Sequence, residues 1–374
     1  MSEGRDIILR VVGQNGSFGI WGGGTRVHCH QLNTFLEERG YKTVTFIPMP
    51  LFDDEYTLRS LIRFDYRHSL SPFVIGLFLF RNRRRILFLH SHLRNASVLM
   101  LLVTSILRVP HVMTVHTPLY ETIPSLKDRV ISFVFGLAVR RAALVIFISR
   151  FVAERVCRQA NVVRSLIVAK IVYNGSDFPA SSPHTGGLSG PLKICVVGEL
   201  SDRKNMSDLL SIIRKLHDGG YGEKVIISVY GSGPYVGSLK DLAAEVPLLR
   251  VMGYEKDTGA IFSGQELHLI LSKNEAFGRV VSEAMAHGVP TLCYRRGAFP
   301  ELIEHGQSGF LSDNRDDLFE QLTSLIGDKA QISPVSKGAR QVFEERFSVD
   351  AFCKATLSAL QEVGLVKVGK ANNG

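Results

Sequence analysis

Short apolar runs alternate with longer amphipathic stretches along this chain of 374 residues. Runs of four to eight apolar residues are typical of strands that are buried on both faces of a sheet. They predict strands at 6–13, 86–89, 111–115, 144–149 and 167–174 in the first half, and at 193–197, 225–230, 249–252, 267–271 and 291–294 in the second.

The amphipathic stretches predict helices at 25–39, 95–107, 126–141, 150–159, 207–218, 237–245, 278–288 and 349–363. Strands that alternate with helices form parallel sheets, so the predicted fold class is α/β with two Rossmann-like domains. A linker rich in Ser, Gly and Pro lies at 176–191. The predicted domains are 1–178 and 191–345, and the segment 346–374 is expected to pack back on the first domain.

One strand-to-helix junction in the second half carries the clearest binding pattern. Glu275 precedes the predicted helix and Glu283 lies about one and a half turns into it, roughly 10 Å away. Between them lie the backbone N–H groups of Gly278, Arg279 and Val280, where the positive end of the helix attracts anions. A carboxylate accepts hydrogen bonds from a diol, so the pattern fits a nucleoside diphosphate sugar. An ordinary amphipathic helix with two solvated glutamates is the alternative.

Other predicted strand ends add candidates of the same kind. Arg203 and Lys204 follow the strand 193–197, where two cations suit a phosphate group, although a solvated loop is the alternative. Gly198 and Gly231 follow strands in the same domain and allow the backbone to approach a ligand closely.

Two strand ends of the first half carry glycines and histidines. Gly22, Gly23 and Gly24 precede a predicted helix, as a phosphate-binding loop or as a flexible turn, and their spacing does not match the GxGxxG pattern of NAD sites. His116 lies at the carboxyl end of a predicted strand, where active sites of parallel sheets form. A metal cluster is not expected, since no carboxylate or cysteine shares the spacing of the remaining histidines, His28, His30, His90 and His92.

Composition and charge limit the class of protein. Apolar residues make up 45% of the chain, as in globular proteins. The five cysteines form no CxxC pair, which favours reduced thiols in a cytoplasmic protein over disulfides or a zinc site. No secretory signal pattern is present, and the longest uncharged apolar stretches are too short to span a bilayer.

The net charge of +9 is concentrated in the first half. Residues 1–185 carry 23 Lys and Arg against 12 Asp and Glu, whereas the rest carry 21 against 23. This excess predicts contact with anionic lipid or a phosphorylated acceptor. Nucleic acid is not expected, because no known nucleic-acid-binding pattern is present. The segment 58–89, which mixes arginines with Phe, Leu and Ile, fits either a membrane interface or a core helix with a basic turn.

Taken together, these features resemble the GT-B glycosyltransferases, specifically the retaining enzymes of family 4. The resemblance spans nearly the whole chain and implies two domains facing a central cleft, with the last helix crossing back to the first domain. It rests on six stretches: Gly22-Gly23-Gly24, TVHTP with His116, YNGSD at 173–177, VGELSDRKN at 197–205, YGSGP at 230–234 and EAFGRVVSEAMAHGVP at 275–290.

The resemblance also implies roles for single residues. Glu275 would bind hydroxyls of the donor sugar and Glu283 the ribose, while Arg203 and Lys204 would neutralise the diphosphate. His116 would contact the donor sugar near the reacting carbon. Nucleotide-binding positions would be Gly23, Gly24, Gly198, Gly231, Gly278, Arg279 and Val280. The family usually has an apolar residue at position 279, so the Arg279 side chain would add phosphate or acceptor contacts.

The implied activity is retaining, metal-independent transfer of a hexose from a UDP- or GDP-sugar to a cell-surface glycan or a lipid-linked acceptor, such as a lipopolysaccharide or exopolysaccharide intermediate. In front-face attack the departing phosphate oxygen helps to take the acceptor's proton. No cofactor or metal is expected beside the donor substrate. The expected location is cytoplasmic and peripheral on the inner face of the cytoplasmic membrane. A nucleotide-sugar epimerase and a non-catalytic, membrane-associated binder of sugar nucleotides are the alternatives.

Overall fold

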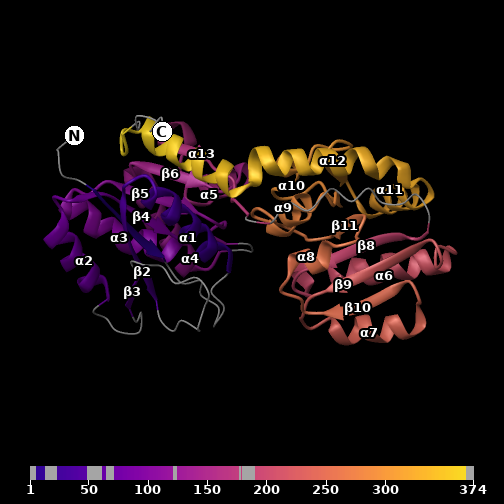
Figure 1. Cartoon of the computed structure of the whole chain (residues 1–374). Helices are drawn as coiled ribbons and strands as arrows, with labels where there is room; N and C mark the ends of the chain where they lie inside the picture. The colour runs from indigo at the N-terminus through magenta and orange to yellow at the C-terminus, as the bar shows by residue number, and fades with distance from the viewer. Residues whose placement is uncertain are drawn as a thin grey trace, which may run out of the picture. The chain divides into compact units, whose positions relative to one another are not determined.

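The computed structural model describes residues 6–12, 23–48, 61–64, 71–120, 124–176, 178 and 190–367. The chain forms two compact units (Figure 1), of which unit 1 comprises Met1–Asn174 with Phe352–Gly374 and unit 2 comprises Gly175–Ala351. Most of the predicted linker 176–191 lies outside the described residues.

Unit 1 is built on a parallel sheet of seven strands in the order β3-β2-β1-β4-β5-β6-β7. The strand order reverses between β1 and β4, and ligands bind at such switch points in open α/β sheets. The strands are β1 (Ile7–Val12), β2 (Lys42–Pro48), β3 (Leu61–Phe64), β4 (Ile86–His92), β5 (His111–Val115), β6 (Leu144–Phe147) and β7 (Ala169–Ile171).

The α-helices in the described part of this unit are α1 (Gly23–Glu37), α2 (Ser71–Asn82), α3 (Arg94–Leu107), α4 (Leu126–Arg141), α5 (Arg150–Gln159) and most of α13 (Val349–Glu362). The last of them comes from the far end of the sequence, as its yellow colour in Figure 1 shows. Glu362 of α13 forms an ion pair with Lys170 of β7, and Cys353 Sγ lies 3.9 Å from the Gln31 carbonyl of α1. The C-terminal segment therefore packs on unit 1.

The alternation of side chains along β1 gives the sheet two different faces. Ile7, Leu9 and Val11 pack in a core with apolar residues of α2 and α3. Arg10 points to the opposite face because successive strand residues alternate. β4 runs to His92, whereas the sequence predicts its end at 89. β1 pairs with β4 from Ile86 to His92, and β5 pairs with its last four residues, Leu89 to His92.

Unit 2 holds a parallel sheet of six strands in the order β10-β9-β8-β11-β12-β13. The strands are β8 (Leu192–Val197), β9 (Val225–Tyr230), β10 (Leu249–Gly253), β11 (Leu267–Ile270), β12 (Thr291–Tyr294) and β13 (Gly309–Ser312). The helices are α6 (Met206–Asp218), α7 (Val236–Glu245), α8 (Thr258–Phe262), α9 (Arg279–Ala286), α10 (Phe299–Leu302), α11 (Arg315–Gly327) and α12 (Ile332–Val342).

Strand β8 shows that this sheet is covered on both faces. Its residues Leu192, Ile194 and Val196 lie in a large core with apolar residues of α6, α7, α11 and α12. Cys195, between them, belongs to a second core with Phe262 of α8 and Ala284 of α9. A sheet buried on both faces has continuous apolar strands, which is the pattern that the sequence shows.

The segment 58–89 contains a core helix followed by a basic turn, which is one of the two predicted alternatives. It contains β3, the helix α2 and the start of β4, while 58–60 and 65–70 lie outside the described residues. Ile75 and Leu79 of α2 are buried in the core, whereas Leu77 and Phe80 are 39% and 54% exposed. The helix is therefore a core element that also presents an apolar edge to solvent.

Candidate functional site

The switch point of the unit 2 sheet brings two predicted site residues together. Strands β8 and β11 are neighbours, and the chain leaves them toward helices of different layers. Lys204 follows β8 in a short 3-10 helix, Asp202–Lys204, and Glu275 lies in the loop after β11. Lys204 Nζ lies 2.5 Å from Glu275 Oε1, and each side chain is only 11% exposed. These two charges therefore form a mostly buried ion pair at the carboxyl edge of the sheet.

Arg203 adds a second cation to this pair. Its Nη1 lies 3.7 Å from Glu275 Oε1, and its Nη2 lies 3.3 Å from Glu199 Oε2. The side chain is 46% exposed, so nearly half of its surface remains open to solvent. The Lys273 backbone N–H donates to the Arg203 carbonyl at 3.2 Å, which holds the two loops against each other. The Glu275 carboxylate therefore contacts two cations, Arg203 and Lys204, at this edge of the sheet.

Helix α9 begins beside this ion pair. Gly278 is its N-cap in the left-handed region, with φ of 85°, and a Cβ there would lie 2.8 Å from the Phe299 ring. Only glycine fits this position, so the chain enters the helix with its first N–H groups close to the loop that carries Glu275. The predicted helix began one residue earlier, at Gly278 itself.

Glu283 lies one turn further along α9. Its side chain is 15% exposed and lies 3.7 Å from Arg279 Nη2. Burial raises the pKa of Glu283, while the charges of Arg279 and Lys204 act in the opposite direction. Lys204 thus influences both predicted carboxylates. The Arg279 side chain therefore pairs with Glu283 one turn along the same helix.

The two glycine loops of unit 2 lie backbone against backbone. Gly198 and Gly231 have φ of 140° and 144°, and a Cβ on Gly231 would lie 1.8 Å from the Gly198 carbonyl oxygen. The Leu200 N–H donates to the Ser232 carbonyl at 2.8 Å. These glycines therefore allow the loops after β8 and β9 to pack together beside Lys204.

Gly297 is a site residue that the sequence reading missed. It follows β12 with φ of 59°, and a Cβ there would lie 2.8 Å from the Glu275 backbone nitrogen. The next residue, Ala298, donates its N–H to the Glu275 carbonyl at 3.0 Å. This loop fixes the backbone that carries Glu275. A glycine three residues after the end of a predicted strand was the available signal.

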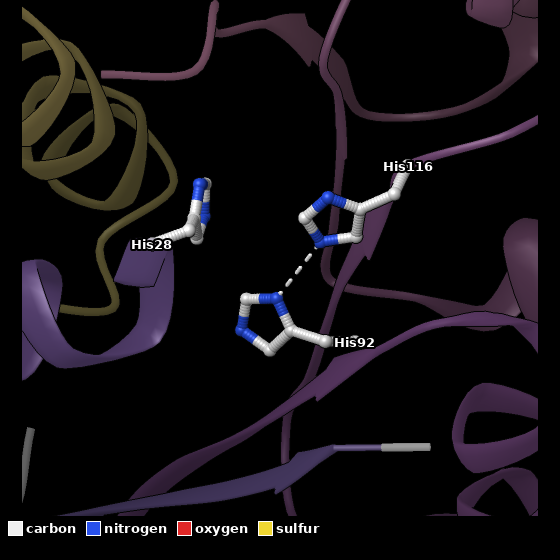
Figure 2. A group of neighbouring side chains, drawn as sticks. All are labelled: His28, His92 and His116. Carbon is white, nitrogen blue, oxygen red and sulfur yellow. Dashed lines mark hydrogen bonds between the residues drawn. The ribbon is translucent and has the colours of Figure 1, made fainter. Parts of the chain in front are cut away.

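In unit 1 the structure gathers three histidines. His116 follows β5, is 8% exposed, and its Nε2 lies 3.1 Å from Nδ1 of His92 (Figure 2). His28 of α1 lies beside both rings, and the potential ligand nitrogens of the three fall within 4.8 Å of one another. The sequence predicts no metal cluster, because no carboxylate or cysteine shares the spacing of the histidines along the chain. The fold nevertheless brings three histidines from distant positions together. His30 and His90 are outside this group, and Gly23 and Gly24 are the first residues of α1.

Two family models match the chain one after the other. The model described as Glycosyltransferase Family 4 matches residues 22–178, and the model described as Glycosyl transferases group 1 matches residues 180–342. The first range holds His116 and the second holds Arg203, Lys204, Glu275 and Glu283.

Curated relatives share part of their length with this chain. N-acetyl-alpha-D-glucosaminyl L-malate synthase of Bacillus anthracis is 26% identical over 167 residues, which are 43% of this chain and 43% of that protein. The putative colanic acid biosynthesis glycosyltransferase WcaL of Escherichia coli is 26% identical over 239 residues, 59% of this chain and 57% of that protein. The chain thus matches about half the length of these relatives.

Solved structures share the fold over nearly the whole chain. Anabaena HepE in complex with UDP superimposes with a TM-score of 0.76 at 20% identity, over 96% of this chain and 100% of that one. The lipopolysaccharide outer core galactosyltransferase WaaB in its apo form gives a TM-score of 0.71 at 14% identity, over 95% and 99%. Two family models and a shared GT-B architecture lead to one conclusion: the chain belongs to the group 1, family 4 glycosyltransferases.

Proposed function

We propose that the protein transfers a hexose from a UDP- or GDP-sugar to a glycan or lipid-linked acceptor, such as an intermediate of lipopolysaccharide or exopolysaccharide synthesis. Its relatives support this class of reaction, since WcaL is named as a putative colanic acid biosynthesis glycosyltransferase. Structures of HepE hold UDP, and one holds UDP-glucose, on the same fold.

The observation that carries the proposal is the ion pair of Lys204 and Glu275 beside Arg203. Burying a carboxylate and an ammonium costs free energy, because both groups lose contact with water. Lys204 and Glu275 offset this cost by pairing with each other. A nucleoside diphosphate sugar offers the same two groups replacement partners. Its diphosphate would take the cations, and its sugar hydroxyls would donate to Glu275.

The remaining predicted residues fit the rest of such a donor. The backbone of Gly278, Arg279 and Val280 would bind the distal phosphate at the start of α9, and Glu283 would accept hydrogen bonds from the ribose hydroxyls. Gly198 and Gly231 would let the loops after β8 and β9 approach the nucleotide. In unit 1, Gly23 and Gly24 would approach the diphosphate, and His116 would contact the sugar.

The proposed chemistry needs no metal ion and retains the anomeric configuration. Arg203 and Lys204 would stabilise the charge that develops on the departing diphosphate, which is the part a divalent cation plays elsewhere. An oxygen of the leaving phosphate would accept the acceptor's proton while the new glycosidic bond forms on the same face. Chelator treatment and NMR of the product anomer test these two points directly.

Substitutions at the ion pair test the assignment. Lys204→Ala and Glu275→Ala each remove charge-assisted hydrogen bonds, so each should lower kcat/KM for donor turnover by about one to two orders of magnitude. Arg214→Ala is the matched control, because it removes an exposed cation whose ion pair among the described residues is with Glu245, at 3.5 Å. Normal turnover in both site variants would contradict the proposed roles.

Donor-only experiments separate the two alternative functions. An epimerase on the same fold would convert the nucleotide sugar without an acceptor, which NMR of the recovered donor would reveal. A non-catalytic binder would bind the donor tightly in calorimetry yet release no nucleotide with any acceptor.

The acceptor side of the proposal includes an anionic membrane surface. No helix within the described ranges is long and apolar enough to cross a membrane. Helices α3 and α4 pack against each other and expose apolar stripes at helical spacing, formed by Leu102 and Ile106 and by Leu126, Val130 and Phe133. Exposed cations flank these stripes, among them Arg108, Lys127 and Arg129. Apolar side chains ringed by cations suit the headgroup region of an anionic bilayer.

This surface differs from the predicted segment 58–89. Among the described side chains of that segment, Leu77, Phe80 and the exposed arginines 81 and 83–85 fit such a role. Vesicle sedimentation tests it with Phe133→Ser and Ile106→Ser together. Binding to vesicles with anionic lipid should fall in the double variant and should be weak to neutral vesicles in the wild type. Equal binding to both vesicle types would remove the electrostatic argument.

A further inference from the structure

A buried arginine connects the polar residues on one face of the unit 1 sheet. Arg10 lies in the middle of β1 and is 0% exposed. Its Nε donates to Asn33 Oδ1 of α1 at 2.8 Å, and Asn33 Nδ2 donates to Thr45 Oγ1 of β2 at 2.9 Å. These bonds hold the guanidinium in one orientation beneath α1.

Arg10 contacts two histidine rings through a single nitrogen. Its Nη1 lies 2.7 Å from Nδ1 of His90 and 3.1 Å from Nε2 of His92. A guanidinium stays protonated and carries only hydrogen-bond donors, two of them on Nη1. Both ring nitrogens must therefore accept, which fixes the tautomer of each neutral ring.

The proton positions follow from ring to ring. His90 accepts at Nδ1, so it carries its proton on Nε2 and donates to Thr114 Oγ1 at 2.7 Å. His92 accepts at Nε2, so it carries its proton on Nδ1, which lies 3.1 Å from Nε2 of His116. That nitrogen of His116 then accepts. A neutral His116 is left with its proton on Nδ1, on the side of the ring away from His92 (Figure 2).

Burial and neighbouring charge keep these rings neutral near pH 7. Burial lowers the pKa of His116 to about 4. Burial, together with His90 and the Arg10 charge, lowers the pKa of His92 well below its usual range. Among the described residues, His28 is a further titratable group that faces both rings, and it also opposes a positive charge on His92.

The same proton arrangement opposes a metal ion at the three histidines. A metal needs an unprotonated nitrogen from each ring. His92 Nδ1, the nitrogen that faces His116, is protonated for as long as Arg10 donates to Nε2. No carboxylate belongs to the group, and the buried Arg10 charge would repel a cation.

We propose that Arg10 is a positioning residue which, through His92, holds His116 as a neutral hydrogen-bond donor at Nδ1. The partner that fits this donor is an oxygen acceptor such as a hydroxyl of a sugar. The identity of that partner rests on the proposed glycosyl transfer, whereas the proton arrangement rests on the Arg10 network alone.

Ring nitrogen NMR of the unliganded full chain tests the proton arrangement. The protein would be labelled with 15N-histidine, and signals would be assigned with His90→Gln, His92→Gln and His116→Gln. At pH 7 we expect protons on Nδ1 of His92 and His116 and on Nε2 of His90. A His116 ring protonated at Nε2, or a charged one, would overturn the proposal. Equimolar Zn²⁺ should leave the His92 and His116 signals unchanged, and their loss would overturn it as well.

Variants of Arg10 test the causal link. Arg10→Met removes the donors, so His116 should become a mixture of tautomers, and Arg10→Lys, which retains a donor, should restore the Nδ1–H form. An unchanged His116 in Arg10→Met would refute the link. If that variant fails to fold, the wild-type spectrum still decides the proton arrangement.

A double-mutant cycle tests the functional consequence. Arg10→Met should lower kcat/KM for transfer roughly tenfold in the wild-type background and less than about twofold in a His116→Gln background. Equal losses in both backgrounds would show that Arg10 does not act through His116. A wild-type protein without transfer activity would instead refute the proposed function and leave the NMR result standing.

Discussion

At the scale of single residues, the site depends on glycines at positions where the Cβ of another residue would clash with the backbone. The loops after β8 and β9 meet at Gly198 and Gly231, and the loop after β12 meets the Glu275 backbone at Gly297. These glycines place the charged residues within bonding distance of each other. Lys204 and Glu275 then form an ion pair across 71 positions of sequence.

Gly231→Ala should destabilise unit 2 by about 2–4 kcal/mol, because the new Cβ would lie 1.8 Å from the Gly198 oxygen in a strained backbone conformation. Thermal unfolding monitored by calorimetry measures the change. Gly222→Ala is the matched control, since nothing lies within 4 Å of its added Cβ. Similar losses of stability in both variants would show that the contact between the loops after β8 and β9 does not exclude a Cβ at position 231.

Glu283→Gln should change how stability depends on pH. The folded-state pKa of Glu283 is raised, so the native state binds its proton more readily than the unfolded chain. The contribution of Glu283 to the free energy of unfolding is therefore greatest at low pH. It is lost as the pH rises above 4.5, the usual pKa of a glutamate. The variant should gain stability relative to the wild type between pH 4 and pH 7 in denaturant titrations. A constant difference would contradict the raised pKa.

At the scale of elements, amphipathic periodicity was a strong guide. Helices α4 and α5 have the predicted bounds, and α3 begins one residue early, because each carries an apolar stripe and a clear end. The strand β4 was predicted too short, since its last residues are polar. His90 and His92 bond to Arg10, which lies 80 and 82 positions away along the chain. Ser91 bonds to the nearby Ser97. These hydrogen bonds make the polar residues compatible with burial.

Ser125→Ala tests the contribution of a local signal. Ser125 and Asp128 form a capping box at the start of α4, so removing the hydroxyl should lower the stability of unit 1 by about 1 kcal/mol. Ser105→Ala in α3 serves as the control, because that hydroxyl donates to the Leu101 carbonyl of its own helix and caps no helix end. Equal stability of both variants in denaturant titration would argue against the cap.

At the scale of the whole molecule, the order of strands and helices predicted two Rossmann-like units, and the C-terminal segment does pack on unit 1. The motifs also predicted which loops carry the charged residues. The pairing of Lys204 with Glu275 was not predictable, because it depends on β8 and β11 being neighbours in the sheet. Arg10 was not among the predicted site residues, although a single arginine in an otherwise apolar strand indicates a buried hydrogen-bond network.

The two units should respond differently to acid. In the described part of unit 1, the pKa values of His90, His92, His111 and His116 are lowered, mainly by burial. Such histidines bind protons more readily when unfolded, so stability falls as pH drops from 6.5 toward 4. One histidine with a pKa of about 4 costs about 2 kcal/mol at pH 5.

Unit 2 contains two histidines with lowered pKa among its described residues, His268 and His287. Calorimetry between pH 7 and pH 5 should therefore show the unit 1 transition shifting down further than that of unit 2. Unit-specific signals from hydrogen exchange would assign the transitions. Parallel shifts would mean that the buried histidines of unit 1 do not dominate its acid sensitivity.

The proposed function depends on the binding of a sugar nucleotide at the carboxyl edge of the unit 2 sheet. A structure of the protein with a bound, non-hydrolysable UDP- or GDP-sugar tests it most directly. We predict that the diphosphate contacts Arg203, Lys204 and the start of α9, and that Glu275 exchanges Lys204 for hydroxyls of the sugar. A diphosphate bound elsewhere, with the Lys204–Glu275 pair intact, would contradict it.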